Sequence, residues 1–261
     1  MLKYFQLYKQ NIFLFYELER EYGEKKMKAV LFDLDGTLLP MDMDVFTRTY
    51  FGYLCKKVAP YGYEAKELIE QVWKGTAAMV QNDGSKTNEE AFWSCFLAHY
   101  GAEHAEDQRL FDEFYRNEFA NAQQVCGKNP LVPQVIRWLK EHGIRIILAT
   151  NPIFPEIATL QRIQWAGLEP EDFELITVYE NCNFAKPNPD YYRDVLARCG
   201  LREDEVVMVG NDVCEDMIAC EKAGIEGFLI TDTMVNKNAI DITQFPHGDF
   251  HDLLAYLERK L

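Results

Sequence analysis

The chain has 261 residues, 48% of them hydrophobic and 26% charged, a composition typical of a globular protein with a filled core. Its length allows one large domain, or a domain with a smaller insert. A formal net charge of −15 argues against nucleic acid and anionic membrane surfaces as partners, because both bind clustered lysine and arginine. Seven cysteines without a Cys-x-x-Cys pair favour free thiols in a reducing cytoplasm over disulfides or zinc.

Residues 1–26 are interpreted as an N-terminal extension. Residues 4–18 are compatible with an amphipathic or largely apolar helix, although no apolar run in the chain is long enough to span a membrane. The first predicted strand starts at Met27, so Met27 is an alternative natural start, and both interpretations stay open. A protein that begins at Met27 is expected to fold and to keep its full activity.

The first strand ends in the most informative motif of the chain. An apolar run over residues 30–32 is followed by Asp33 and Asp35, which are one residue apart, and then by Gly36 and Thr37. A buried strand that ends in this way presents both carboxylates at the carboxyl edge of a sheet, where α/β proteins bind ligands. Gly36 allows the sharp turn, because glycine adopts positive φ without strain.

Helical spacing follows over residues 42–125. Thr87 and Glu90 have the spacing of a capping box. Apolar and aromatic residues recur every three or four positions, and this pattern predicts the core of a small helical bundle rather than a cofactor site. The residues of these stripes are Leu68, Ile69, Val72, Trp73, Val80, Phe92, Trp93, Phe96, Leu97, Tyr100, Leu110, Phe111, Phe114, Tyr115 and Phe119.

Beyond residue 130, predicted strands alternate with predicted helices. The strands are predicted over residues 144–149, 175–179, 205–209 and 227–230, and the helices over residues 132–139, 155–166, 190–199, 215–223 and 250–260. This alternation indicates an α/β fold with a doubly wound parallel sheet. The predicted core domain therefore comprises residues 27–41 and 126–261, and residues 42–125 form an α-helical domain inserted after the first strand.

Polar groups follow four of the predicted strands. If the strands are parallel, these groups converge at one edge of the sheet. They are Asp33 and Asp35, Thr150 and Asn151, Lys186, and finally Asn211, Asp212 and Asp216.

In these motifs and their order, the chain resembles the haloacid dehalogenase superfamily, in the phosphatase and phosphomutase branch that carries a helical cap after the first strand. The resemblance extends from residue 27 to about residue 232. It implies a Rossmann-like core, a covalent aspartyl-phosphate mechanism and a requirement for Mg²⁺.

The resemblance also implies roles for the two acids of the first motif. Asp33 is expected to attack phosphorus, which splits one difficult step into two easier ones. Asp35 is expected to protonate the leaving alkoxide and then to deprotonate the hydrolytic water. Mg²⁺ held by Asp33, the backbone carbonyl of Asp35 and Asp212 would offset the repulsion between the carboxylate and the phosphate.

The remaining motifs are expected to bind the phosphoryl group and to support the metal. Thr150 and Lys186 are expected to hold phosphoryl oxygens, and Asn151 could add a donor. Many members of the superfamily have Asp where this chain has Asn211, so the register of the last motif is ambiguous. Asp212 is the favoured metal ligand, with Asp216 orienting Lys186 or a metal-bound water.

The resemblance predicts a cytoplasmic, Mg²⁺-dependent phosphomonoester hydrolase that acts on a small phosphorylated metabolite. Asp35 argues against the dehalogenases and phosphonatases of the superfamily, which lack an acid at that position. A phosphomutase of the β-phosphoglucomutase kind shares the core motifs and remains an alternative, and a non-catalytic binding module is less favoured. Residues 41–44 and 73–79 are expected to select the substrate, and the sequence leaves its identity and the oligomeric state open.

Overall fold

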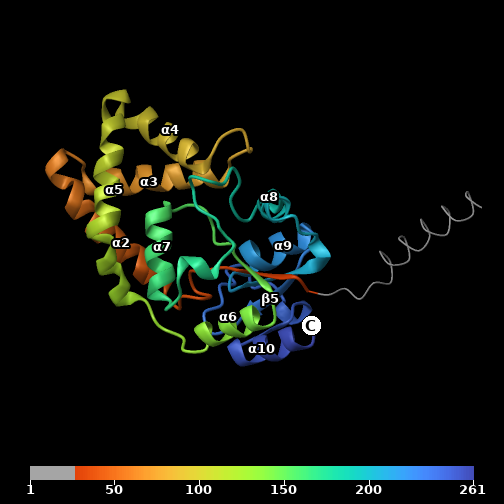
Figure 1. The fold of residues 1–261 in the computed structure, drawn as a ribbon. Coiled ribbons are helices and arrows are strands. Elements are labelled where there is room, and N and C mark those ends of the chain that lie inside the picture. Colours follow the sequence, from red (N-terminus) through yellow and green to blue (C-terminus); the bar gives the residue numbers. More distant parts are fainter. Residues whose placement is uncertain (1–26) are drawn as a thin grey trace, which may run out of the picture.

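The structure, a computed structural model, describes residues 27–261, and the predictions made for residues 1–26 lie outside this part (Figure 1). The described residues form one sheet of six parallel strands in the order β3-β2-β1-β4-β5-β6. The strands are β1 (Ala29–Phe32), β2 (Arg145–Leu148), β3 (Leu175–Ile176), β4 (Val206–Gly210), β5 (Glu226–Ile230) and β6 (His247–Gly248). The predicted doubly wound parallel sheet is confirmed.

The α-helices occupy most of the chain between the strands. They are α2 (Met43–Val58), α3 (Ala65–Val80), α4 (Asn88–Tyr100), α5 (Gln108–Asn117), α6 (Val132–Glu141), α7 (Glu156–Trp165), α8 (Pro189–Cys199), α9 (Ala219–Lys222) and α10 (Phe250–Glu258). Shorter helical segments are η1 (Ala59–Tyr61), η2 (Ala102–Asp107), η3 (Phe119–Val125), η4 (Pro170–Asp172), η5 (Glu203–Glu205), η6 (Val213–Ile218) and η7 (Ile242–Gln244). No helix among residues 27–261 is long and apolar enough to cross a membrane.

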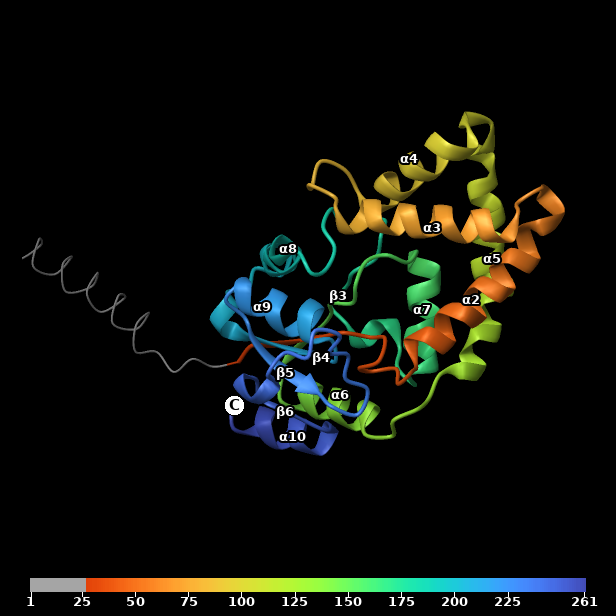
Figure 2. The same ribbon diagram turned by 180° about the vertical axis from the view of Figure 1, so that it is seen from behind.

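Both faces of the sheet are buried under helices (Figures 1 and 2). Alternate residues of a strand point to opposite faces, and in β1 Val30 and Phe32 belong to one apolar cluster while Ala29 and Leu31 belong to another. Helices α8 and α9 cover the second face, and α6 and α10 cover the first. The strands are accordingly apolar on both faces, as is typical of a parallel sheet in an α/β protein.

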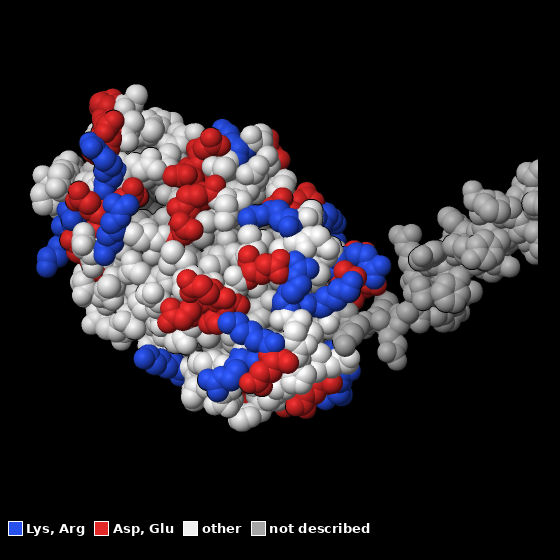
Figure 3. Space-filling view, in the orientation of Figure 1, with Lys and Arg blue, Asp and Glu red and all other residues white. Residues whose placement is uncertain are grey.

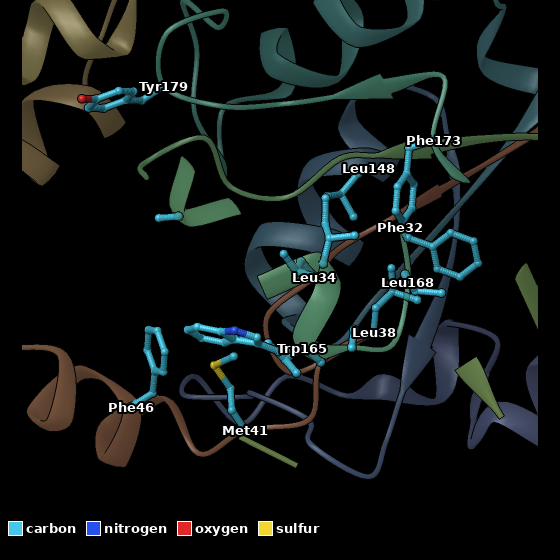
Figure 4. Close-up of a cluster of buried hydrophobic side chains, with 14 of the residues drawn as sticks. Phe32, Leu34, Leu38, Met41, Phe46, Leu148, Trp165, Leu168, Phe173 and Tyr179 are labelled. Atoms are coloured by element: carbon cyan, nitrogen blue, oxygen red, sulfur yellow. The ribbon is translucent and has the colours of Figure 1, made fainter. Parts of the chain in front are cut away.

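Residues 42–125, hereafter the helical segment, pack through aromatic rings, as the sequence pattern predicts. Phe96 and Phe114 are fully buried, and the predicted capping box of Thr87 and Glu90 is present at the start of α4. Trp73 differs from the prediction, since 51% of it is exposed. Figure 4 shows that Phe46 of α2 lies in the same apolar cluster as side chains of the sheet.

The larger differences from the sequence-based expectation concern three elements. Strand β3 is limited to Leu175–Ile176, and the short strand β6 was not predicted. The helix expected over residues 215–223 begins as the π-helical turn η6, in which both the Asp216 and the Met217 amides donate to the Asp212 carbonyl. Such wide turns are frequent at functional sites, and η6 contains Asp216 of the last predicted motif.

Candidate active site

The topology of the sheet brings the predicted motifs together. Strand β1 lies between β2 and β4, with Phe32 opposite both Leu148 and Val209. The residues that follow these three strands therefore leave the sheet at one edge. This edge contains the switch point of the strand order, where open α/β sheets bind their ligands.

Lys186 lies at the centre of this edge. Its side chain is buried, and its ammonium donates to Asp33 Oδ1 at 2.9 Å and to Asp216 Oδ1 at 2.6 Å. Burial alone would lower the pKa of Lys186, but the carboxylates of Asp216 and Asp33 raise it well above its ordinary value. The ammonium therefore stays charged, and it joins motifs that are far apart in the sequence.

The pKa of Asp33 is also raised, which for an acid disfavours the charged form. Burial raises the pKa of its carboxyl from 3.8 to about 8, with the charges of Asp216 and Asp35 adding to the shift and Lys186 opposing it. A carboxyl with such a pKa is ionised only in part near neutral pH. A further cation beside Asp33 would favour the carboxylate that a nucleophile requires.

The turn after β4 is folded around the Asp216 carboxylate. Asp216 Oδ2 accepts from the backbone amides of Asn211 at 3.0 Å and Asp212 at 2.9 Å. A side chain at Gly210 would place its Cβ 2.3 Å from Asp216 Cγ, so the backbone there requires glycine. Asp216 thus positions Lys186 with one oxygen and holds the turn with the other.

Asn211 fastens this turn to the first motif. Its Oδ1 accepts from Thr37 Oγ1 at 3.2 Å, and its Nδ2 donates to the Thr233 carbonyl at 2.8 Å. Gly36 has a φ of +86°, and a Cβ there would lie 2.3 Å from Asn211 Nδ2. Because both polar ends of the Asn211 amide are engaged in these contacts, Asp212 is the better placed of the two to bind a ligand.

Thr150 and Asn151 follow β2 at the same edge of the sheet. Thr150 is buried, and its hydroxyl makes no hydrogen bond to another residue of the described chain, whereas its carbonyl accepts from Thr177 and Tyr191. Asn151 accepts from the Lys186 amide at 3.2 Å through Oδ1 and donates to Glu215 Oε2 at 2.9 Å. The amide of Asn151 is therefore occupied by protein contacts, in contrast to the free hydroxyl of Thr150.

Glu215 is a neighbour of the site that the sequence analysis did not assign. Burial raises the pKa of its carboxyl to about 7, Lys186 lowers it, and Asp216 and Asp212 raise it further. In the sequence, its position within the last motif is the feature that could have identified it as a site residue. The contact with Asn151 became visible only in the folded chain.

The acidic groups at this edge outnumber the single ammonium, and this imbalance fits a divalent cation. Burial also raises the pKa of Asp212, whose Oδ1 caps η6 by accepting from the amides of Cys214 and Glu215. Among residues 27–261, no three His, Cys, Asp or Glu side chains already form a metal cluster. The carboxylates of Asp33 and Asp212 match the oxygen ligands of Mg²⁺, whose remaining positions suit carbonyl, water and phosphate oxygens.

Asp35 has a partner that the sequence did not reveal. The guanidinium of Arg162, in α7, donates from Nη1 to Asp35 Oδ2, and its side chain is 1% exposed. Arg162 also donates to the Ala158 carbonyl and lies 4.3 Å from the centre of the Phe154 ring. Asp35 Oδ1 is buried and accepts no hydrogen bond within the described chain. An arginine within an apolar helix pattern is ordinarily solvated, so the sequence carried no signal for this pair.

Replacing Arg162 with methionine is expected to destabilise the fold by about 3 kcal/mol, because the Asp35 carboxylate would stay buried without its counter-charge. Urea unfolding measures this loss. The matched control is Arg193→Met, whose pair with Asp190 is about half exposed and contributes at most about 1 kcal/mol. Combining Arg162→Met with Asp35→Asn is expected to recover part of the loss; equal losses for Arg162→Met and the control would contradict a buried, stabilising pair.

The part of the chain that contains this site matches a known family. The sequence model of the haloacid dehalogenase-like hydrolases matches residues 27–224. The chain belongs to this family. The sequence-based prediction of the family is confirmed, and the protein is a hydrolase.

Curated relatives in the family include phosphatases. The chain is 28% identical over 201 residues to a phosphoglycolate phosphatase of Photorhabdus laumondii, covering 77% of this chain and 78% of the relative. It is 27% identical over 202 residues to a phosphorylated carbohydrates phosphatase of Thermotoga maritima, covering 77% and 83%. The crystal structure of a 2-haloacid dehalogenase from Pseudomonas syringae matches with a TM-score of 0.60 at 17% identity, covering 90% of this chain and 100% of that one. This last likeness supports the fold alone.

Proposed function

We propose that the protein is a Mg²⁺-dependent phosphomonoester hydrolase that acts on a small phosphorylated metabolite through a phosphorylated Asp33. The observation that carries this proposal is the buried contact of Lys186 with both Asp33 and Asp216 beside the Asp33-x-Asp35 motif. The phosphatase names of relatives that are aligned over 77% of the chain support it. The domains proposed are the core, residues 27–41 and 126–261, and a cap, residues 42–125.

Asp33 is the nucleophile in this proposal. It is the first residue after β1, and its amide donates to the Val209 carbonyl at 2.9 Å, which fixes its backbone to the sheet. Lys186 holds the carboxylate through Oδ1, which leaves Oδ2 to attack phosphorus. The free hydroxyl of Thr150 and the remaining proton of the Lys186 ammonium are donors for phosphoryl oxygens.

Asp35 is the general acid and base. Arg162 binds its Oδ2, so Oδ1, which has no partner in the described chain, is the oxygen that exchanges a proton with the leaving group and later with water. The Arg162 contact orients the carboxyl group.

Asp33 and Asp212 are the carboxylates proposed to hold Mg²⁺, with the Asp35 carbonyl as a further ligand. Bound Mg²⁺ would neutralise the charge of the phosphate and of the acids around it. Asn211 and Asp216 would support the site through the turn after β4, and Asn151 through its contacts with Lys186 and Glu215. The free cysteines of the described chain fit the proposed cytoplasmic location.

The raised pKa values predict how stability depends on pH and on Mg²⁺. The pKa of Asp33 rises from 3.8 to about 8 and the pKa of Glu215 from 4.5 to about 7, so the folded protein binds protons more tightly than the unfolded chain. The stability that this contributes is complete below the unfolded values and is lost as the pH rises through the folded ones. Without Mg²⁺, the melting temperature is therefore expected to fall between about pH 6 and about pH 8.

Mg²⁺ is expected to raise the melting temperature more at about pH 8 than at about pH 6, because its ligands must be deprotonated. Differential scanning calorimetry with Mg²⁺ and with chelator measures the difference. Asp212→Asn is expected to lose this gain, whereas the exposed control Asp204→Asn keeps it. A gain that is the same at both pH values would contradict a site built from these carboxyls.

A phosphate-release screen tests the proposed activity. Sugar phosphates, nucleotides, phosphoglycolate and para-nitrophenyl phosphate are each incubated with Mg²⁺ and with chelator. Release of phosphate that requires Mg²⁺ is the expected result, and absence of release from every ester would refute the proposal. An isomer formed without free phosphate would instead indicate the phosphomutase alternative.

A further inference from the structure

A pocket lined by aromatic rings lies between the proposed cap and the loop after β2. Its volume is about 820 Å³, open solvent included. Tyr50, Trp73, Phe92, Trp93 and Phe154 are among the rings of its wall. Trp73 belongs to an apolar stripe of α3, yet it is half exposed and lines this open space.

The pocket adjoins the proposed active site. Its floor includes Phe154, three residues after Asn151, and the Arg162 guanidinium that binds Asp35 lies 4.3 Å from the centre of the Phe154 ring. Tyr179, another lining residue, points away from the strands of the sheet (Figure 4). A phosphate ester bound at Asp33, with its leaving oxygen toward Asp35, would thus extend its alcohol part toward the aromatic wall.

The charged side chain in the pocket wall is acidic, and acidic side chains lie near it. The pocket wall includes no lysine, arginine or histidine, and its single charged residue, Asp112 of α5, makes no ion pair with another residue of the described chain. Glu89 and Glu180 lie near it, and burial raises the pKa of both carboxyls. Repulsion from Asp112 raises the pKa of Glu89 further, and repulsion from Glu89 raises the pKa of Glu180 further. Figure 3 shows acidic side chains gathered between the cap helices and α7.

The aromatic wall and the charge of Asp112 together favour some alcohol groups of a phosphate ester over others. A second anionic group, such as a carboxylate, would meet Asp112, whereas Arg162, the cation beside the Phe154 ring, is already paired with Asp35. The hydroxyls of a sugar would lose water against ring faces that offer few hydrogen bonds. A substituted ammonium, by contrast, is attracted by aromatic faces and by a nearby carboxylate, and this is how aromatic cages bind quaternary ammonium groups.

We propose that the substrate is a phosphomonoester of an alkylammonium alcohol, with its ammonium group in the aromatic pocket and Asp112 as the counter-charge. This inference rests on the proposed phosphatase function and adds the class of substrate. Hydrolysis transfers the phosphoryl group to water and releases the ammonium alcohol with its charge unchanged.

A matched pair of esters tests the inference. Phosphocholine carries the cation, and 3,3-dimethylbutyl phosphate is its neutral isostere, in which carbon replaces nitrogen. In a phosphate-release assay with Mg²⁺, kcat/KM for phosphocholine is expected to exceed that for the isostere about tenfold, which corresponds to about 1.4 kcal/mol. Phosphoglycolate, with its second anion, is expected to be the poorest of the three.

Two variants of α5 test whether Asp112 causes the preference for phosphocholine over the neutral isostere. Asp112→Asn is expected to bring the ratio of the two kcat/KM values close to one. The control Glu113→Gln removes the same charge from the next residue, which is exposed and pairs with Lys57 at 3.7 Å, and it is expected to keep the ratio. Because a ratio is independent of the fraction of folded enzyme, reduced stability of a variant cannot mimic the result.

The outcomes separate the inference from the proposed function. Equal or better hydrolysis of the neutral isostere by the unaltered enzyme would overturn the ammonium substrate and leave the phosphatase in place. A ratio unchanged in Asp112→Asn would overturn the role of Asp112. Failure to release phosphate from all three esters and from para-nitrophenyl phosphate would refute the proposed function itself.

Discussion

Asp33→Asn is expected to lower kcat by about 10⁴-fold or more, because it removes the nucleophile and one proposed Mg²⁺ ligand together. The substitution preserves the shape of the side chain, and Lys186 keeps Asp216 as its partner at 2.6 Å. Steady-state phosphate release measures the loss, and mass spectrometry of enzyme quenched during turnover is expected to detect no phosphorylated protein.

Asp204→Asn is the matched control for this variant. Asp204 is exposed and precedes β4, so it lies at the amino end of the strands, away from the proposed site. Its substitution is expected to leave kcat unchanged. If Asp33→Asn kept substantial Mg²⁺-dependent turnover, Asp33 would be positioning a water molecule instead of attacking phosphorus.

Asp35→Asn is expected to lower activity by about 10²- to 10⁴-fold, the usual contribution of general acid and base catalysis. The loss should be greatest for alkyl phosphates, whose leaving alcohols need protonation, and smaller in the first step for aryl phosphates. Burst kinetics with para-nitrophenyl phosphate separate phosphorylation of the enzyme from its hydrolysis. An equal loss of the first step for alkyl and aryl esters would contradict the role of Asp35 as the acid.

This comparison between esters is also the internal control of the experiment. Asp35→Asn leaves Arg162 buried without its charged partner, so the variant is expected to be less stable than the unaltered protein. Lower stability reduces the rates for all substrates alike, whereas loss of the acid changes their ratio.

The parallel sheet and the convergence of the motifs could be predicted from the sequence because both follow from local patterns. Apolar runs alternate with helical spacing, and parallel strands carry whatever follows them to one edge. Asp33, Lys186 and Asp216 were assigned to one site on this ground, and in the structure they are joined by hydrogen bonds. Their proposed roles stay predictions until the variants are measured.

The pair of Arg162 with Asp35 could not be predicted in the same way. The two residues are 127 positions apart, and their contact depends on how α7 packs beside the first motif. The aromatic pocket also depends on how distant segments pack, since its wall combines the helical segment with the loop after β2. The sequence analysis treated these rings as core residues but also expected residues 41–44 and 73–79 to select the substrate, and Met43, Trp73 and Thr76 of these ranges line the pocket.

The stereochemistry at phosphorus tests the covalent mechanism most directly. A phosphorothioate ester made chiral at phosphorus with sulfur and ¹⁸O is hydrolysed in ¹⁷O-labelled water by the unaltered enzyme with Mg²⁺, and the configuration of the thiophosphate released is determined. Transfer first to Asp33 and then to water comprises two in-line displacements, each of which inverts phosphorus, so the account predicts net retention. Net inversion would show a single displacement by water and would contradict a phosphorylated Asp33.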